Sequence, residues 1–233
     1  MIRPALALLS LALPWSAHAA TRNFIISSFD HIRVDGPFAV TVTTGKPPSA
    51  SAEGSLDALD GVTLEVDDDT LVVSMGAGNW TSDSGKMVTP PAITVTTQRL
   101  ERATINSGAT LVVDAMKGQQ VSVALNGTGA LTVGGITADQ FAATILGTGR
   151  MTLAGKAARG RFVVSGPGSI DARQLMVGDL TARSDGPGEL DLAARYTANV
   201  TSTGLGLIDV AGTPSCTVRA IAGGPIRCGQ QHD

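Results

Sequence analysis

Apolar and polar residues alternate along most of this chain, and the alternation returns with a nearly constant period. A short Gly-x-Gly phrase begins at Gly127, Gly147, Gly166, Gly186 and Gly204, in steps of 20, 19, 20 and 18 residues. Positions four and six residues on either side of each first glycine are almost all apolar, and those between them are mostly polar. Because strand side chains point alternately to two faces, each unit is predicted to be a strand, a glycine bend and a second strand.

One such unit cannot bury its apolar face alone. Stacking successive units about 4.8 Å apart joins the faces into one core, which is the architecture of a β-solenoid. Glycine permits positive φ at each bend, and Pro167 and Pro187 fix φ there. An antiparallel meander or sandwich also spaces its turns regularly. It does not, however, require apolar residues at the same positions of six successive units. The sequence therefore predicts an all-β, right-handed parallel β-helix with coils of about 19 residues.

Residues 20–100 are also rich in strand patterns but lack the Gly-x-Gly phrase. Apolar runs at Val62–Val66 and Leu71–Val73 flank three aspartates, which predicts a hairpin with a tight acidic turn rather than a cation site. Ser55–Leu59 fits one helical turn. An open solenoid end exposes unpaired strand edges, so we expect these N-terminal strands to form the first coils and to cap the repeats of residues 101–233.

The first 19 residues have the pattern of a secretory signal peptide. Arg3 supplies the positive start, an apolar run follows, and Ala17-His18-Ala19 forms a small-x-small cleavage site before Ala20. The apolar run is too short to span a bilayer, and no later stretch is long enough. We therefore expect export through a cleaved signal peptide, to the periplasm or to the cell surface and exterior, with no membrane span.

Charge narrows the class of partner. Without Arg3 the chain has 16 basic and 20 acidic residues, a net charge of −4. A mildly acidic protein without a basic block is not expected to bind nucleic acid. The expected partner is an envelope protein or a glycan, and no cofactor is expected.

Three blocks of sequence resemble a known bacterial family. They are FDHIRVDGPFAVTV at residues 29–42, LEVDDDTLVV at 64–73, and PAITVTTQRLERATINSGA at 91–109. Their order and spacing are similar to those of the "putative auto-transporter adhesin, head GIN domain" family, over about residues 24–228 as one continuous domain. The resemblance implies an exported all-β protein with β-helix character and, from the family name, adhesion. It brings no defined catalytic or binding residues.

The two cysteines occupy matched positions in the last unit. Cys216 lies six residues before the glycine position and Cys228 six after it, where earlier units place apolar, inward-facing residues on either side of one bend. We predict a disulfide that closes the final coil, which an exported protein permits. A redox or metal pair is the alternative, but the chain has no Cys-x-x-Cys, and only His31 and His232 remain after cleavage.

A second candidate is a column of carboxylates. Asp171, Asp191 and Asp209 each lie five residues after the first glycine of their unit, so they should stack outward on successive coils. Carboxylates about 5 Å apart could recruit Ca²⁺. The column continues as threonine on one side and Arg227 on the other, and its spacing differs from that of Ca²⁺-binding β-rolls. We favour a solvated polar ladder and predict no metal site.

Trp80 is the one tryptophan that remains after cleavage, and it lies in a polar loop between Gly76 and Pro91. An exposed loop aromatic is a natural contact for a sugar or a protein. A lid folded back over the first coils is an equally good interpretation.

Two functions fit these observations. The first is a non-catalytic, adhesin-like module of the cell envelope or surface, whose long regular face binds a polymer or protein and whose flat outward faces could also self-associate. The alternative is a β-helix enzyme, a lyase or hydrolase acting on polysaccharide, which needs paired carboxylates or a basic residue beside Ca²⁺ in an aromatic groove. Phe141 and Phe162 fall in core columns, leaving Tyr196 and Trp80 as groove residues. We favour the first and assign no catalytic residue.

Overall fold

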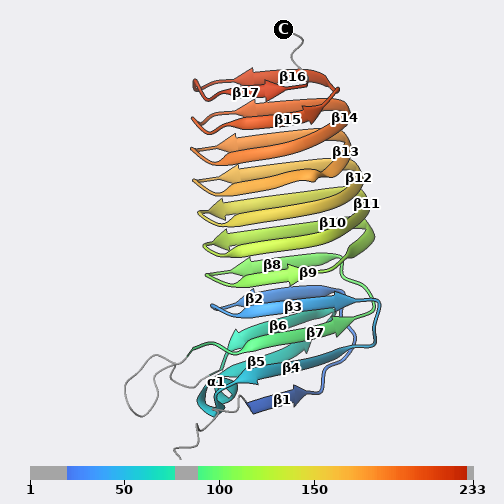
Figure 1. Ribbon diagram of the computed structural model, residues 1–233, viewed down its shortest axis with the longest axis vertical. Helices are drawn as coiled ribbons and strands as arrows, with labels where there is room; N and C mark the ends of the chain where they lie inside the picture. Colours follow the sequence, from blue (N-terminus) through green and yellow to red (C-terminus); the bar gives the residue numbers. More distant parts are fainter. Residues whose placement is uncertain (1–19, 77–88, 230–233) are drawn as a thin grey trace, which may run out of the picture.

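The computed structural model of the protein describes residues 20–76 and 89–229. These residues form a column of stacked parallel coils with a β-rich cap at the N-terminal end (Figure 1). The chain is therefore a β-solenoid, as the repeat predicted. The predicted signal peptide, residues 1–19, and Trp80 lie outside the described residues.

Strands dominate the described residues, with one short helix in the cap. In chain order the elements are β1 (Ala20–Phe24), β2 (His31–Asp35), β3 (Ala39–Thr44), β4 (Ser49–Gly54), α1 (Leu56–Asp60), β5 (Val62–Asp67), β6 (Thr70–Met75), β7 (Ala92–Thr97), β8 (Arg102–Asn106), β9 (Thr110–Val113), β10 (Met116–Gly127), β11 (Ala130–Gly147), β12 (Arg150–Ser165), β13 (Ser169–Asp185), β14 (Glu189–Ser202), β15 (Ile208–Gly212), β16 (Ser215–Ala220) and β17 (Ile226–Cys228).

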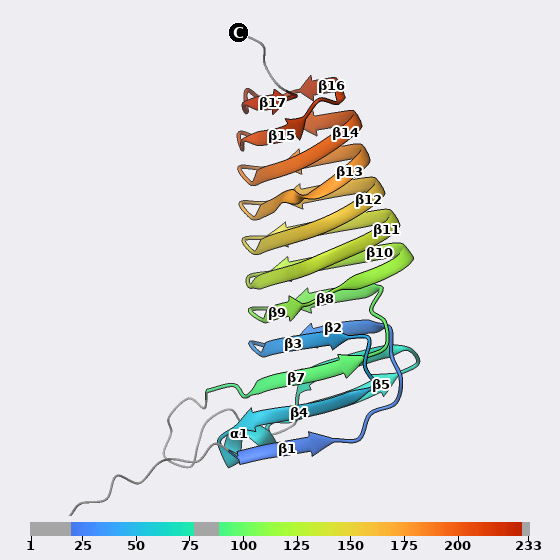
Figure 2. The ribbon, with the colours of Figure 1, turned by 45° about the vertical axis from the view of Figure 1, so that its right-hand side comes forward.

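The solenoid has two faces, joined at a sharp edge and a wide edge (Figure 2). We call one the β2 face; it contains β2, β8, the second halves of β10–β14, and β16. The other is the β3 face, with β3, β9, the first halves of β11–β14, β15 and β17. Side chains on each face alternate between the core and the solvent.

At the wide edge the strands are longer than the sequence predicts. The sequence suggests two separate strands per unit, but β11 runs without interruption from the β3 face, around the wide edge, to the β2 face. Its register against β12 shifts between Val133 and Ile136, and Gly155 opposite has φ +129°. An irregularity of this kind bends a strand while most of its hydrogen bonds are kept.

Glycine is required at the sharp edge for two separate reasons. Gly147 has φ +128°, a conformation that side chains rarely adopt. A Cβ at Gly147 would also lie only 2.5 Å from the carbonyl oxygen of Gly127 in the preceding coil. The repeated Gly-x-Gly phrase is therefore explained by backbone conformation together with the close stacking of one bend on the next.

One continuous apolar core runs from the cap to the last complete coils. The columns predicted to face inward do so in every unit but the last; Val123, Phe162 and Leu190 are all buried. In the last unit Val218 is exposed and Ile226 is only partly buried. Phe162 packs against Phe141 with ring centroids 5.8 Å apart. Phe141 lies opposite Gly160, where a Cβ would approach the Phe162 ring to 3.0 Å. The glycine in an otherwise apolar column therefore makes room for an aromatic side chain.

The N-terminal strands form the first coils and the cap, as expected, but their spatial order differs from their order in the chain. β2 and β3 lie between β6 and β7 on one side and β8 and β9 on the other. Beyond them the pairing becomes antiparallel, through β1–β4, β4–β7 and the predicted β5–β6 hairpin. The predicted helical turn is α1, in which the Ala58 amide donates a hydrogen bond to the Ser55 hydroxyl oxygen at the N-cap.

The predicted disulfide joins Cys216 of β16 to Cys228 of β17. All six residues of β16 are exposed, because no described strand stacks beyond this coil. The bridge spans 12 residues in sequence and so fastens together the two strands of the last coil, each of which pairs with a described strand on one side only.

Replacing both cysteines by serine is expected to loosen the last coil by about 3 kcal/mol, the loop-closure contribution of a bridge of this length. Hydrogen exchange measures this directly: amides of β16 and β17 should exchange faster, while those of β11 and β12 serve as an internal control and keep their protection. Unchanged exchange in β16 would contradict the role assigned to the bridge.

Candidate functional site

The wide edge of the solenoid carries a groove of about 530 Å³, which we call the edge groove. Short residues in two neighbouring columns of successive coils form its floor, with Gly118, Ala138 and Ala157 in one column and Ala158 and Gly178 in the other. The larger residues on its walls are Thr137, Asp139, Lys156, Met176, Asp179, Arg195 and Tyr196.

Two apolar side chains are unusually exposed in the edge groove. Tyr196 is 58% exposed and Met176 is 45% exposed. The guanidinium carbon of Arg195 lies 5.2 Å from the centre of the Tyr196 ring, a cation–π contact that holds the ring at the groove wall. An aromatic ring held on a rigid sheet edge offers a flat apolar surface for stacking.

The polar groups of the edge groove have mixed charge. Lys156 contributes a cation, and Asp139 and Asp179 contribute carboxylates. The Asp179 carboxylate accepts a 2.7 Å hydrogen bond from the Thr197 hydroxyl of the next coil. The groove therefore offers both donors and acceptors beside its aromatic wall.

A second hollow, of about 360 Å³, lies on the β2 face next to the edge groove; we call it the face hollow. Ser122 and Ala142 stack between Arg102 and Arg161 in one outward column, and these two short side chains leave the space. The remaining lining residues are His31, Glu101, Gln120, Val121, Gln140 and Phe141.

Outside these hollows the outward columns are largely tied together by their own side chains. Asn126 donates to Asn106, which donates to Asp35, across three stacked strands. Further along the same column, hydrogen bonds from Arg183 and Thr203 lower the pKa of Asp185. Polar groups that satisfy one another in this way have less capacity left for a ligand.

The three aspartates proposed as a ladder do stack on the β3 face, in register with one another. They have a partner that was not expected from the sequence. Arg173 donates a 2.6 Å hydrogen bond to Asp191 and lies 3.7 Å from Asp171, and its contacts with these carboxylates, the Asp191 hydrogen bond above all, raise its pKa. Arg173 thus supplies the positive charge that a Ca²⁺ ion would bring to this pair. Its position two residues after Asp171, on the same strand face, was the available signal.

Within residues 20–76 and 89–229 no group of three or more His, Cys, Asp or Glu side chains could hold a metal ion. The same residues contain no helix with the length and apolarity needed to cross a bilayer. Phe141 and Phe162 are core residues, as predicted, and Tyr196 is the predicted groove aromatic that the structure describes.

Solved structures with the same fold cover almost the whole chain. A protein described as a "putative adhesin" from Bacteroides fragilis aligns with a TM-score of 0.81 and 19% identity, over 92% of this chain and 98% of that one. Another "putative adhesin", from Parabacteroides merdae, has a TM-score of 0.71, 17% identity and coverages of 92% and 97%. A "putative lipid binding protein" from Parabacteroides distasonis has a TM-score of 0.70, 18% identity and coverages of 92% and 98%. Likeness at these identities shows the fold alone.

None of the curated proteins matches the chain. A family match, by contrast, spans residues 28–214, most of the chain and nearly all of the solenoid. It includes the three sequence blocks quoted above and the five Gly-x-Gly phrases. The chain belongs to the family described as "Putative auto-transporter adhesin, head GIN domain".

Proposed function

We propose that this protein is an exported, non-catalytic, adhesin-like module of the cell envelope or surface, and that it binds a polymer or protein partner at the edge groove. The observation that carries the proposal is the half-exposed Tyr196 ring, fixed on the wall of a 530 Å³ groove in a rigid solenoid. Burying an aromatic ring against a partner is a common source of binding energy.

Family membership and the printed names of the structural neighbours support a binding role over catalysis. Export is supported by the signal-peptide pattern of residues 1–19 and by the Cys216–Cys228 disulfide, a bond that persists in oxidising compartments. The expected location is the periplasm or the cell surface.

A second candidate function, cleavage of polysaccharide, has one observation in its favour. Asp139 and Asp179 line the same groove as Tyr196, and glycoside hydrolases use pairs of carboxylates. The two aspartates come from β11 and β13, with one complete coil between them, and the Thr197 hydroxyl already engages Asp179. We therefore prefer binding. Release of reducing sugar or unsaturated product by the wild type, lost in Asp179→Asn, would favour the enzyme.

Tyr196→Ala is expected to weaken binding of the partner by about 5- to 30-fold, because a stacked aromatic contributes about 1–2 kcal/mol. A glycan array and a panel of purified envelope proteins identify the ligand with wild-type protein, and calorimetry then measures the change. Tyr196→Phe keeps the ring and should retain most of the affinity.

Leu205→Ala is the matched control, because Leu205 is also a well-exposed apolar residue, 71% exposed, but lies at the sharp edge. It should bind as the wild type does. Equal loss of affinity in Tyr196→Ala and Leu205→Ala, or unchanged affinity in Tyr196→Ala, would show that the edge groove is not the binding site.

A further inference from the structure

Strand β12 carries an unusual concentration of positive charge. Its sixteen residues include Arg150, Lys156, Arg159 and Arg161, and no acidic residue. All four side chains are exposed, and within the described part of the chain none of them makes an ion pair or a side-chain hydrogen bond. These cations are therefore free to meet a ligand.

Five other arginines of the described residues are neutralised locally. Arg33 pairs with Asp35 at 2.8 Å, and Arg183 with Asp185 at 2.7 Å. Arg22, Arg99 and Arg173 likewise lie within 4.0 Å of carboxylates. Arg102, Arg195, Arg219 and Arg227 also lack a carboxylate partner among the described residues. What distinguishes β12 is that it groups four unpaired cations on one strand, whereas both arginines of the adjacent β13 are paired, in a protein whose net charge is negative.

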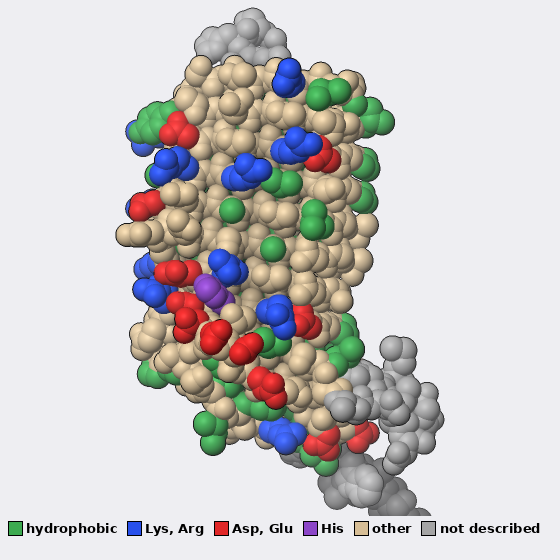
Figure 3. All heavy atoms as spheres, turned by 180° about the vertical axis from the view of Figure 1, so that it is seen from behind, with side chains coloured by type: hydrophobic (Ala, Val, Ile, Leu, Met, Phe, Trp, Pro, Cys, Tyr) green, Lys and Arg blue, Asp and Glu red, His purple; other side chains and the backbone are tan. Residues whose placement is uncertain are grey.

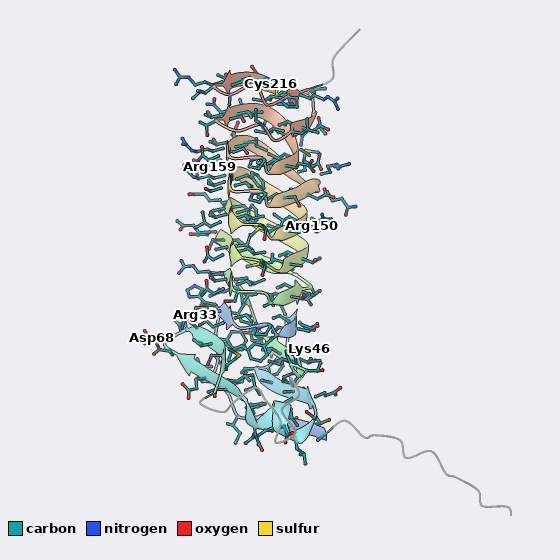
Figure 4. The ribbon with its side chains drawn as sticks, turned by 90° about the vertical axis from the view of Figure 1, so that its left-hand side faces the viewer. Arg33, Lys46, Asp68, Arg150, Arg159 and Cys216 are labelled. Atoms are coloured by element: carbon teal, nitrogen blue, oxygen red, sulfur yellow. A yellow bond between two sulfur atoms is a disulfide. The ribbon has the colours of Figure 1, made fainter. Side chains whose placement is uncertain are left out.

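Three of the four cations of β12 lie on one side of the molecule. Arg159 projects from the side that carries Arg33, and Arg150 projects from the opposite side, which also carries Lys46 several coils away (Figure 4). Arg161 lines the face hollow and Lys156 lines the edge groove. Arg159 stands between the two hollows, in the column that contains Gln140 and Asp179.

The two hollows and Arg159 therefore make one strip, which we call the basic strip. It starts at Arg102, crosses Ser122 and Ala142 to Arg161, and passes Arg159 to reach Lys156 and Tyr196. Glu101, Asp139 and Asp179 also line it, so that with Arg195 its five cations exceed its three carboxylates by two. Glu101 is already paired with Arg99 at 3.0 Å. Arg102 and Arg161 are three strand steps apart, on the order of 14 Å. Viewed from this side, basic side chains extend over the middle and upper coils, and acidic ones are most numerous towards the cap (Figure 3).

We propose that the basic strip binds an acidic polysaccharide with regularly spaced carboxylates, a polyuronate. The inference rests on the proposed function and names the class of polymer that the module would take. Cations separated by about 14 Å can meet separate acidic groups along one extended chain, with Arg159 between them. The amides of Gln120 and Gln140 can bond sugar hydroxyls, and the exposed Tyr196 ring suits the apolar face of a sugar.

The proposal is tested with mature protein and alginate as the probe, at 50 and 300 mM NaCl, using calorimetry. Wild-type protein should bind alginate and should bind it several-fold more weakly at the higher salt. Arg159→Gln combined with Arg161→Gln should weaken binding at least about tenfold, because each lost charge-assisted hydrogen bond is worth more than a neutral one.

Arg150→Gln combined with Lys46→Gln is the matched control. It removes the same total charge from the opposite side and should leave alginate affinity within about twofold, since screening weakens exposed charges that are not in contact. Equal loss of alginate binding in the two double variants would show that binding responds to net charge alone. That result would contradict the assignment of the basic strip as the binding site.

Two further measurements distinguish failure of this inference from failure of the proposed function on which it rests. Neutral dextran and a short DNA duplex should bind at least tenfold more weakly than alginate. If the glycan array yields only neutral ligands or a protein, and their affinity depends on Tyr196 but not on Arg159 and Arg161, the inference fails and the proposed function stands. Equal binding of DNA and alginate, or no binding of alginate, would also overturn it.

Discussion

Phe162→Ala is expected to lower the free energy of unfolding by about 3–5 kcal/mol, the usual cost of removing a fully buried aromatic ring. Phe162 is 0% exposed and lies between Ala143 and Ala182 of the adjacent coils, with Gly160 beside it. None of these neighbours is large enough to refill the space. Urea unfolding followed by far-UV circular dichroism measures the change.

Val163→Ala is the control, since Val163 is the next residue along β12 but faces outward and is only half-buried. It should cost less than about 1 kcal/mol. Phe162→Leu should fall between the two, because it retains part of the buried volume. A Phe162→Ala protein as stable as Val163→Ala would mean that the aromatic pair does not hold the central coils together.

Gly147→Ala is expected to destabilise the protein by about 2–4 kcal/mol, because it combines an unfavourable positive φ with a clash against the backbone of the preceding coil. The clash involves the Gly127 carbonyl oxygen, which cannot move without shifting that coil. The same urea titration reports the loss.

Two other glycines separate the two contributions. Gly45 has φ +79° with no heavy atom within 4 Å of a Cβ, so Gly45→Ala isolates the backbone term, about 1 kcal/mol. Gly223 has open space and no positive φ, so Gly223→Ala should change stability by less than about 0.5 kcal/mol. Equal stability of all three variants would contradict the account of the bend.

The repeat made the solenoid predictable because two constraints coincide in every unit. Positions that face the core need apolar residues, and the bend at the sharp edge needs glycine. Each coil therefore repeats the same pattern of apolar residues and glycine. The pairing of Cys216 with Cys228 followed from the same columns, because earlier units place Val121 and Val133 at the equivalent positions. Agreement between local pattern and global packing is what makes a fold readable from a sequence.

The cap and the binding surfaces were harder to predict. No repeat indicates that β2 and β3 lie between strands that occur later in the chain. The edge groove depends on short residues, such as Gly118 and Gly178, at the wide edge. These residues also recur from unit to unit, but they lie outside the apolar positions that define the repeat. Arg173 was missed because the carboxylates were considered without the charged residue on the same strand face.

The placement of β2 and β3 has a consequence for how the molecule is made. Both strands need neighbours from β6 to β9, so a chain that emerges N-terminus first holds β2 and β3 without these flanking strands until about residue 113 has appeared. Each later coil can then pair with the strands of the coil that precedes it in the chain. Assembly is therefore expected to be slow at the start, where contacts are distant in sequence, and to proceed afterwards by short local additions towards the C-terminus.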